Sequence, residues 1–333
     1  MITIRLTQNV FKYFVFLVLF FTTLSYAQED SFDIKIQNLK DDIVKSNGGH
    51  KLRLLDSLSR FISYNRTHLK FDSITKNTID LAYELDSIDL ALVRTNSLIF
   101  YYANRVNRPK EGIKVLKDFE SRNIQTNDYD LLARLYTNAG DAYFFSGAIK
   151  ESIPIYNKAE DFALKDNDSV LYAQARTYKA SAYVDTGDYA TGSQLLSETT
   201  KMFTVLKDTS GILSARNTLA VVYSKMGFYE EAKEERAEVI RISKMQKKYR
   251  SIVPNLFNAA IDADKNDNQA LRIKYLNESY RYNKTDESTP RTRLSSIITY
   301  SLLSAYSEND SLVKAQQFYN KVQSEFSNED QSF

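Results

Sequence analysis

The feature that most constrains the fold of this chain is an internal repeat with a period of 40 residues. A tyrosine and a glycine four positions apart recur three times, at Tyr143 and Gly147, Tyr183 and Gly187, and Tyr223 and Gly227. Each glycine follows a small residue by seven positions and precedes a large apolar one by two; these are Gly140, Ala180 and Ala220, and Ile149, Tyr189 and Tyr229. Such a period predicts stacked supersecondary units that bury their apolar faces against one another.

Each repeat has the pattern of two helices joined by a short turn. Apolar residues recur at helical spacing on both sides of the glycine, and the small residue lets a second helix approach closely. The glycine can adopt the left-handed conformation at low cost and so ends the first helix. One face of the second helix carries Ser152, Tyr156 and Ala159, and two repeats later Ala232, Arg236 and Val239. With only 9 Gly and 4 Pro, the chain has too few turn residues for an all-β protein.

These residues resemble a known signature. The set that carries the resemblance is Tyr136, Ala139, Gly140, Tyr143, Gly147, Ile149, Tyr156 and Ala159. It is similar to the signature of the tetratricopeptide repeat family, although the usual Trp and closing Pro are missing. The resemblance implies an all-α fold, a right-handed α-solenoid. Because the family repeat has about 34 residues, a period of 40 predicts longer helices, by about one turn shared over each pair.

The resemblance covers nearly all of the chain after residue 27 and is strongest from about 128 to 246. We expect one repeat domain over 28–333, with six or seven helix pairs after a helix near Phe32 to Val44. Weaker copies lie at Leu52 to Tyr64, Phe71 to Leu85, the Pro109 turn, Ala259 to Tyr275 and Ala305 to Val322. Thr289-Pro290 predicts a helix start, and aspartates recurring in the linkers predict helix N-caps, at Asp128, Asp168 and Asp208.

The first 27 residues are typical of a secretory signal peptide. Arg5 and Lys12 give a basic start, Phe14 to Leu24 is almost wholly apolar, and Ser25-Tyr26-Ala27 supplies small residues for cleavage. We expect the mature chain to begin at Gln28 and to be periplasmic or secreted. The alternative is an uncleaved anchor, but the apolar segment is shorter than the ~20 residues of a membrane-spanning helix. No later segment approaches that length.

The charges argue against nucleic acid and anionic membranes as partners. The chain has 44 Lys plus Arg and 42 Asp plus Glu, and the leader holds two of the basic residues and none of the acidic ones. The rest is neutral and lacks the clustered basic footprint that nucleic acid requires. Because there is no cysteine, we expect neither disulfides nor a lipid on an N-terminal cysteine.

We expect no catalytic residue, no metal and no cofactor. His50 and His68 are isolated, and no cysteine accompanies them, which argues against a transition-metal site. The sequence contains no phosphate-binding loop, no nucleophile elbow and no kinase signature. Acidic pairs such as Glu230-Glu231 are typical of a solvated helix face.

The resemblance implies that the first helix of each pair lines a concave binding groove. Carried over by position, the lining residues fall on three consecutive repeats. They are Arg134, Thr137, Asp141, Phe144 and Phe145; then Gln174, Thr177, Ser181 and Asp185; and then Asn217, Val221, Ser224 and Lys225. Polar groups beside two adjacent aromatic residues suit an extended peptide or a partner helix. The alternative is that Phe144 or Phe145 packs in the core.

Two functional hypotheses follow. The first is an exported, non-catalytic scaffold that binds a protein or peptide through this groove. The second is the sensor or input region of a bacterial signal-transduction or transcription regulator that lacks its effector module. An enzyme built on the repeats is the weakest alternative, since no catalytic site is visible in the sequence.

Overall fold

The computed structural model of the protein describes residues 32–64, 70–285, 293–309 and 311–329, and within these ranges there are helices and turns but no β-strand. The all-α prediction is therefore confirmed. The predicted leader (1–27), His68 and the predicted helix start at Thr289-Pro290 lie outside the described residues. The chain forms two compact units, which meet at Leu131 and Leu132 in the first turn of α6. The prediction of one domain over 28–333 stays a prediction.

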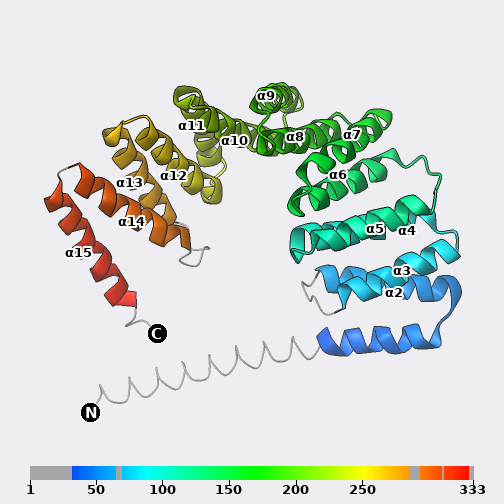
Figure 1. The fold of residues 1–333 in the computed structure, drawn as a ribbon. Coiled ribbons are helices and arrows are strands. Elements are labelled where there is room, and N and C mark those ends of the chain that lie inside the picture. Colours follow the sequence, from blue (N-terminus) through cyan, green and yellow to red (C-terminus); the bar gives the residue numbers. More distant parts are fainter. Residues whose placement is uncertain (1–31, 65–69, 286–292, 310, 330–333) are drawn as a thin grey trace, which may run out of the picture. The chain divides into compact units, whose positions relative to one another are not determined.

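Unit 1, up to Leu131, begins with a helix over residues 32–45. Four more α-helices and a single π-helical turn follow (Figure 1): α2 (Gly48–Tyr64), α3 (Phe71–Glu84), α4 (Ile88–Phe100), η1 (Tyr101–Arg105) and α5 (Pro109–Ser121). Consecutive helices pack against each other. Proline supplies the first turn of α5, where its missing N–H costs nothing.

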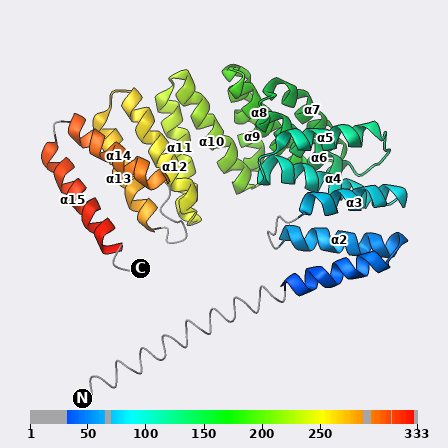
Figure 2. The ribbon, with the colours of Figure 1, turned by 60° about the horizontal axis from the view of Figure 1, so that its bottom comes forward.

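Unit 2, from Leu132, contains the remaining helices. They are α6 (Tyr129–Phe145), α7 (Ile149–Lys165), α8 (Ser169–Asp185), α9 (Tyr189–Val205), α10 (Thr209–Met226), α11 (Tyr229–Met245), α12 (Tyr249–Lys265), α13 (Gln269–Thr285), α14 (Arg293–Glu308) and α15 (Leu312–Glu329). Figure 2 shows α10 to α15 lying side by side in chain order. In the described ranges, seven helix pairs thus follow the helix over 32–45, as predicted.

Helices from α6 to α13 begin 20 residues apart, so a pair occupies 40 residues. Most of these helices have 17 residues, as α7, α8 and α9 show. A helix of that length has almost five turns and is about 25 Å long. This confirms that the 40-residue period reflects long helices and not long loops.

The turns of unit 2 share one backbone conformation. Gly147, Gly187 and Gly227 have φ between 81° and 89°, and in the next residue the N–H bonds back to the carbonyl five positions earlier, as from Ala148 to Tyr143. This is the Schellman ending of a helix. The turns between pairs use it too, but with non-glycine residues at φ 54° to 59°, namely Asn167, Lys207 and Lys247.

Aspartates begin the next helices, as predicted. The Asp168 carboxylate accepts hydrogen bonds from the backbone N–H of Val170 and Leu171 at 2.8 and 2.9 Å. Asp208 repeats this with Ser210 and Gly211, and Asp128 accepts from Leu131 at 3.0 Å. An N-cap of this kind satisfies donors that the helix itself leaves open.

Small residues of the first helices receive large residues of the second. Ala180 and Ala220 are fully buried. A Cβ atom at Gly140 would come within 2.3 Å of the Tyr156 ring, and one at Gly211 within 2.3 Å of Phe203. At these two positions only glycine permits the ring contact, whereas alanine suffices at 180 and 220.

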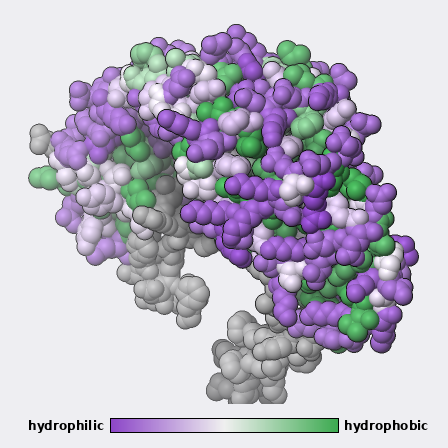
Figure 3. Space-filling view, turned by 45° about the vertical axis from the view of Figure 1, so that its right-hand side comes forward, coloured by the Kyte–Doolittle hydropathy of each residue, from purple (hydrophilic) through white to green (hydrophobic). Residues whose placement is uncertain are grey.

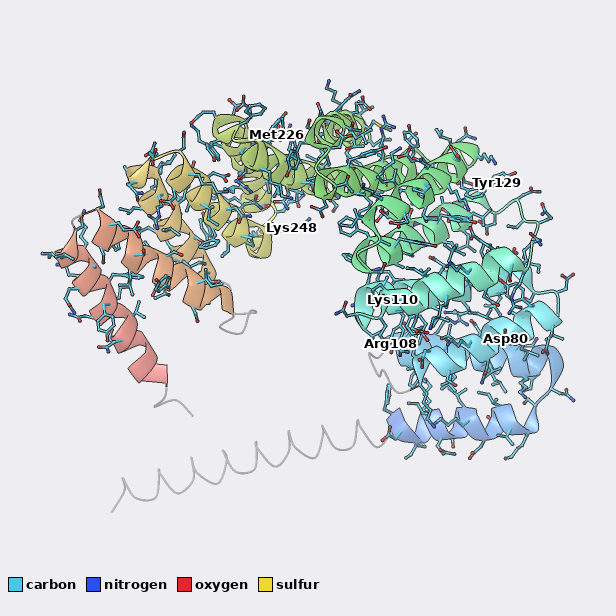
Figure 4. All side chains as sticks on the ribbon, in the orientation of Figure 1. Asp80, Arg108, Lys110, Tyr129, Met226 and Lys248 are labelled. Carbon is cyan, nitrogen blue, oxygen red and sulfur yellow. The ribbon has the colours of Figure 1, made fainter. Side chains whose placement is uncertain are left out.

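Unit 1 has its own core, built from residues of three helices and η1, which are Leu55, Leu58, Ile62, Phe71, Ile74, Ile79, Leu98 and Tyr102. Tyr102 lies in the π-helical turn, fully buried, and its hydroxyl donates to the Asp72 carboxylate at 3.2 Å. In the view of Figure 4, Arg108 lies at one end of this unit and Asp80 at the other. Arg122 contacts Asp80 there at 3.1 Å.

The surface is mixed in character. Figure 3 shows mostly hydrophilic side chains on one face, with hydrophobic ones scattered among them. None of the helices in the described part of the chain combines the length and hydropathy that crossing a membrane requires.

Candidate binding face on the first helices of unit 2

The first helices of the pairs, α6, α8, α10 and α12, carry the candidate face, which we call the first-helix face. They begin 40 residues apart, so equivalent side chains recur at the same height on each helix. Two side-chain contacts show that neighbours in this row lie side by side: Lys225 Nζ donates to Asp185 Oδ1 at 3.2 Å, and Ser224 Oγ bonds Asp262 Oδ1 at 2.5 Å. The second helices α9 and α11 lie on the other side of α8 and α10 (Figure 1).

The aromatic end of α6 is the most exposed apolar part of this face. Phe145 leaves 52% of its surface accessible, whereas Phe144 is half-buried. Their rings meet edge to face, with centroids 5.5 Å apart at 85°. One phenylalanine therefore anchors the other, and Phe145 is held toward solvent at little cost in side-chain entropy.

The other predicted residues of α6 differ in their surroundings. Arg134 is exposed, and Thr137 donates its hydroxyl to the carbonyl of Ala133 at 2.8 Å. Asp141 accepts a hydrogen bond of 2.8 Å from the Tyr156 hydroxyl. Burial and the Asp141 charge raise the pKa of Tyr156 above its usual value, so this phenol stays a donor. Asp141 is consequently fixed in orientation on α6.

On α8 the structure separates the predicted residues. Gln174 and Ser181 are half-buried, and Asp185 is exposed and paired with Lys225. Thr177 is only 4% exposed, and its hydroxyl donates to the carbonyl of Ala173. Its side chain is therefore part of the packing and not of the accessible face. The reason is that position 177 points toward the neighbouring helices in a pair that packs closely around alanines.

On α10, Asn217 and Lys225 are exposed, and Val221 is half-buried. Ser224 takes part in a polar network and is not open to solvent. The Asp262 carboxylate accepts a hydrogen bond from the Ser224 hydroxyl and another, at 2.9 Å, from Nε of Arg236. Arg236 and Asp262 are 2% and 5% exposed. The sequence analysis placed Arg236 on the packed face of α11 but did not predict its ion pair with Asp262.

Sequence reasoning missed Tyr178 and Ile261, which are 41% and 39% exposed. Tyr178 stacks on Tyr156 with centroids 6.2 Å apart. The signal was available in the repeat: Asn138, Tyr178, Thr218 and Asn258 share one register, as do Asp141, Ser181, Val221 and Ile261. The aromatic and apolar members of these two rows extend the accessible part of the face beyond α6.

Comparisons with known proteins agree with the repeat and the fold. Residues 133–166 match the family model described as tetratricopeptide repeat, which covers α6 and α7 almost entirely. No curated protein matches the chain significantly in sequence.

Solved structures share the fold at low identity. The apo form of RapI has a TM-score of 0.63 at 13% identity, over 81% of this chain and 75% of that one. The signal transduction ATPase PH0952 from Pyrococcus horikoshii, with a tetratricopeptide repeat sensor, has 0.59 at 16%, over 89% and 48%. The apo form of the quorum sensor NprR from B. thuringiensis has 0.51 at 15%, over 88% and 75%. These likenesses concern the fold alone.

Proposed function

This chain is a tetratricopeptide repeat protein, and from that premise we propose that it is a non-catalytic scaffold that holds a protein or peptide partner on the first-helix face of unit 2. The observation that carries the proposal is the exposed Phe145, braced by Phe144. Arg134 stands 11 residues earlier, which is three helical turns, so both side chains lie on one face about 16 Å apart. An aromatic anchor and a guanidinium at that separation suit a peptide of about five extended residues.

The neighbouring helices supply polar and apolar groups for the rest of such a partner. Tyr178 and Gln174 belong to α8, and Asn217 and Lys225 to α10. Tyrosine and arginine are enriched in binding hot spots: tyrosine offers a large contact area at low cost in side-chain entropy, and arginine offers several hydrogen-bond donors in a fixed geometry. We propose that the partner contacts these groups in the periplasm or outside the cell, after export by the N-terminal leader.

The decisive experiment is alanine substitution of Phe145 and Arg134, measured as affinity for a partner captured by crosslinking in the native envelope. We expect each substitution to weaken binding by about tenfold or more, the typical loss at a central contact. The matched control is Leu164→Ala on the second helix α7, since Leu164 is 57% exposed but lies off the face. If all three variants bind like the parent chain, the first-helix face is not the binding site.

The second candidate function is the sensor region of a regulator. Its support is that two proteins of similar fold are a quorum sensor and an ATPase with a repeat sensor. The two functions differ in the fate of the leader. Sequencing the N-terminus of the natural protein separates them, because a start at Gln28 supports a free exported scaffold and a retained leader supports an anchored sensor.

A further inference from the structure

Consecutive helices of unit 2 pack against each other across short turns and so run in opposite directions. The turns between pairs therefore lie at one end of the helices, and the turns within pairs lie at the other. Figure 4 shows this for α11, with Met226 near its start and Lys248 just after its end. Residues 204–208 connect α9 to α10, and residues 244–248 connect α11 to α12. We call these two segments the inter-pair edge.

Aliphatic side chains project from the inter-pair edge into solvent. Val205 is 82% exposed and Met245 is 74% exposed. They occupy the same position of the repeat, 40 residues apart, and Leu206 beside Val205 is exposed as well. Single exposed apolar residues are common on protein surfaces. Here they recur at the tips of consecutive turns, so one partner can cover them together.

Four lysines lie next to these side chains: Lys207, Lys244, Lys247 and Lys248. All four are exposed, and among the residues that the structure describes none of them forms an ion pair with a carboxylate. The one acidic residue of the two segments is Asp208, whose carboxylate caps α10. The inter-pair edge is therefore a cationic surface with aliphatic tips.

The opposite ends of the same helices have a different charge pattern. There Lys225 bonds Asp185 at 3.2 Å, and Lys233 is paired with Glu230. Carboxylates thus neutralise lysines at that end and leave those of the inter-pair edge uncompensated. The near-neutral total of the sequence, which argues against an anionic membrane as a partner, conceals this separation of charge along the helices.

Lys207 and Lys247 also occupy the strained positions of their turns. Their φ values are 57° and 54°, in the left-handed region where the turns within pairs use glycine, as at Gly227. A side chain destabilises this conformation relative to glycine. Strain of this kind is characteristic of functional positions, and at both turns the strained residue is a lysine.

We propose that the inter-pair edge docks on an anionic lipid surface. The lysines contact the lipid phosphates, and Val205, Leu206 and Met245 reach the boundary of the acyl chains. Lysines near such a surface each contribute to binding, and the aliphatic tips add buried apolar area.

The shape of the edge favours a lipid layer over a folded partner. The apolar groups stand on the tips of two turns, and a folded protein would need two matching hollows to receive them, whereas a lipid layer deforms around them. A lysine ammonium is a compact point charge and requires no fixed geometry from a phosphate. The inter-pair edge lies at the ends of the helices and does not rest on the first-helix face, so either proposal can fail alone.

Vesicle binding by the whole chain tests the role of the charges. We expect at least about tenfold tighter binding to vesicles of mixed phosphatidylglycerol and phosphatidylcholine than to phosphatidylcholine alone, and salt should reduce the difference. Lys247→Gln combined with Lys248→Gln should weaken binding to the anionic vesicles by about tenfold or more, since each lysine contributes about fivefold. The N-terminus is the same in every variant, so differences between variants report on the inter-pair edge.

The matched control combines Lys233→Gln with Lys265→Gln, which removes the same charge at the opposite ends of the helices. We expect this control to bind the anionic vesicles like the parent chain. Equal losses in the two double variants, or equal binding of the parent chain to both kinds of vesicle, would overturn the proposal.

Tryptophan fluorescence distinguishes a lipid surface from a soluble polyanion. The chain contains no tryptophan, so Met245→Trp introduces a single reporter. We expect its emission to shift to shorter wavelengths with the anionic vesicles and to be quenched by lipids brominated in their acyl chains. The matched control is Phe228→Trp, at the other end of α11, where the exposed side chain should show neither change.

Two outcomes of the fluorescence experiment would contradict lipid docking. A shift of equal size at positions 228 and 245 would show that the inter-pair edge is not the site of contact. Lysine-dependent binding without any change at position 245 would assign the edge to an acidic protein or a nucleic acid instead.

Discussion

In unit 2 a residue with left-handed backbone conformation recurs every 20 positions, and glycine alternates there with residues that have a side chain. The turn inside the first three pairs uses Gly147, Gly187 and Gly227, whereas the turn after each of these pairs uses Asn167, Lys207 or Lys247. A residue with a Cβ atom pays about 1–2 kcal/mol for this conformation, and glycine does not. A glycine substitution in one of the turns between pairs should therefore increase the stability of the protein.

Lys207→Gly is expected to stabilise the protein. Lys207 has φ 57° and lies outside the regular hydrogen bonding of α9, so glycine relieves strain and removes no contact. We expect a gain of up to about 1 kcal/mol, measured by urea unfolding. The control Lys201→Gly, in the middle of the same helix, should instead cost about 1 kcal/mol. Equal effects of the two substitutions would show that strain at position 207 is negligible.

Tyr102 predicts a loss of stability in alkali. Burial, and then the neighbouring Asp72 carboxylate, raise the pKa of this phenol to about 12 from an ordinary value of 10.0. Because the folded pKa exceeds the unfolded one, the stabilisation is complete below pH 10 and is lost as the pH rises from 10 to 12. The urea midpoint should fall over this window. The fall should be smaller in Tyr102→Phe, and an identical profile would contradict this assignment.

At the scale of the elements, polar networks link helices that the hydrophobic repeat alone would only stack. Asp262 of α12 binds Ser224 of α10 and Arg236 of α11, so one carboxylate joins three consecutive helices. Nη1 of Arg236 is buried without a partner among the described residues. In the equivalent place two repeats earlier, Tyr156 fills the space with a ring and bonds Asp141. Equivalent positions of the repeat, 156 and 236, are therefore filled either by an aromatic ring or by a residue of a buried ion pair.

Breaking the Arg236–Asp262 ion pair should destabilise the protein strongly, whereas replacing both residues by apolar ones should not. Asp262→Ala leaves Arg236 charged and buried, and we expect it to cost about 3–5 kcal/mol in urea unfolding. The double variant Arg236→Met with Asp262→Leu removes both charges at similar volume and should recover most of that loss. A double variant no more stable than Asp262→Ala alone would show that packing, and not the stranded charge, determines the cost.

At the scale of the molecule, stability in a repeat array is a sum of terms for each repeat and its neighbours. Leu196 is fully buried in α9 and belongs to a core that α8, α9 and α10 build together. Its neighbours in that core are local in sequence, as in every cluster of unit 2. Damage to one pair should therefore spread to adjacent helices and fade along the array.

Leu196→Ala tests this directly. We expect a cost of about 2–5 kcal/mol, typical of a buried leucine whose site cannot fully collapse. Hydrogen exchange should accelerate in α8 to α11 and remain at parental rates in α2 to α5. Leu58→Ala, in the core of unit 1, is the mirror control. Uniform acceleration over the whole chain would indicate a single cooperative unit instead of a divisible array.

The sequence by itself determined the helical content, the pairing of helices and their length. These follow from local chemistry: a left-handed glycine, a capping aspartate and apolar spacing act over a few residues and recur every 40. It also placed Arg134 on an accessible face, because position in the register sets direction on a helix, but it left open whether Phe144 or Phe145 packs in the core.

Only the tertiary structure decided which polar residues remain available. Thr177 and Ser224 occupy positions that the register assigns to the groove, yet one is buried and the other is bonded to Asp262. The pairing of Asp56 with Arg94 spans 38 residues and joins different helix pairs. Such contacts depend on the distance and angle at which neighbouring helices pack. Many side chains together determine that packing, so no single sequence position predicts it.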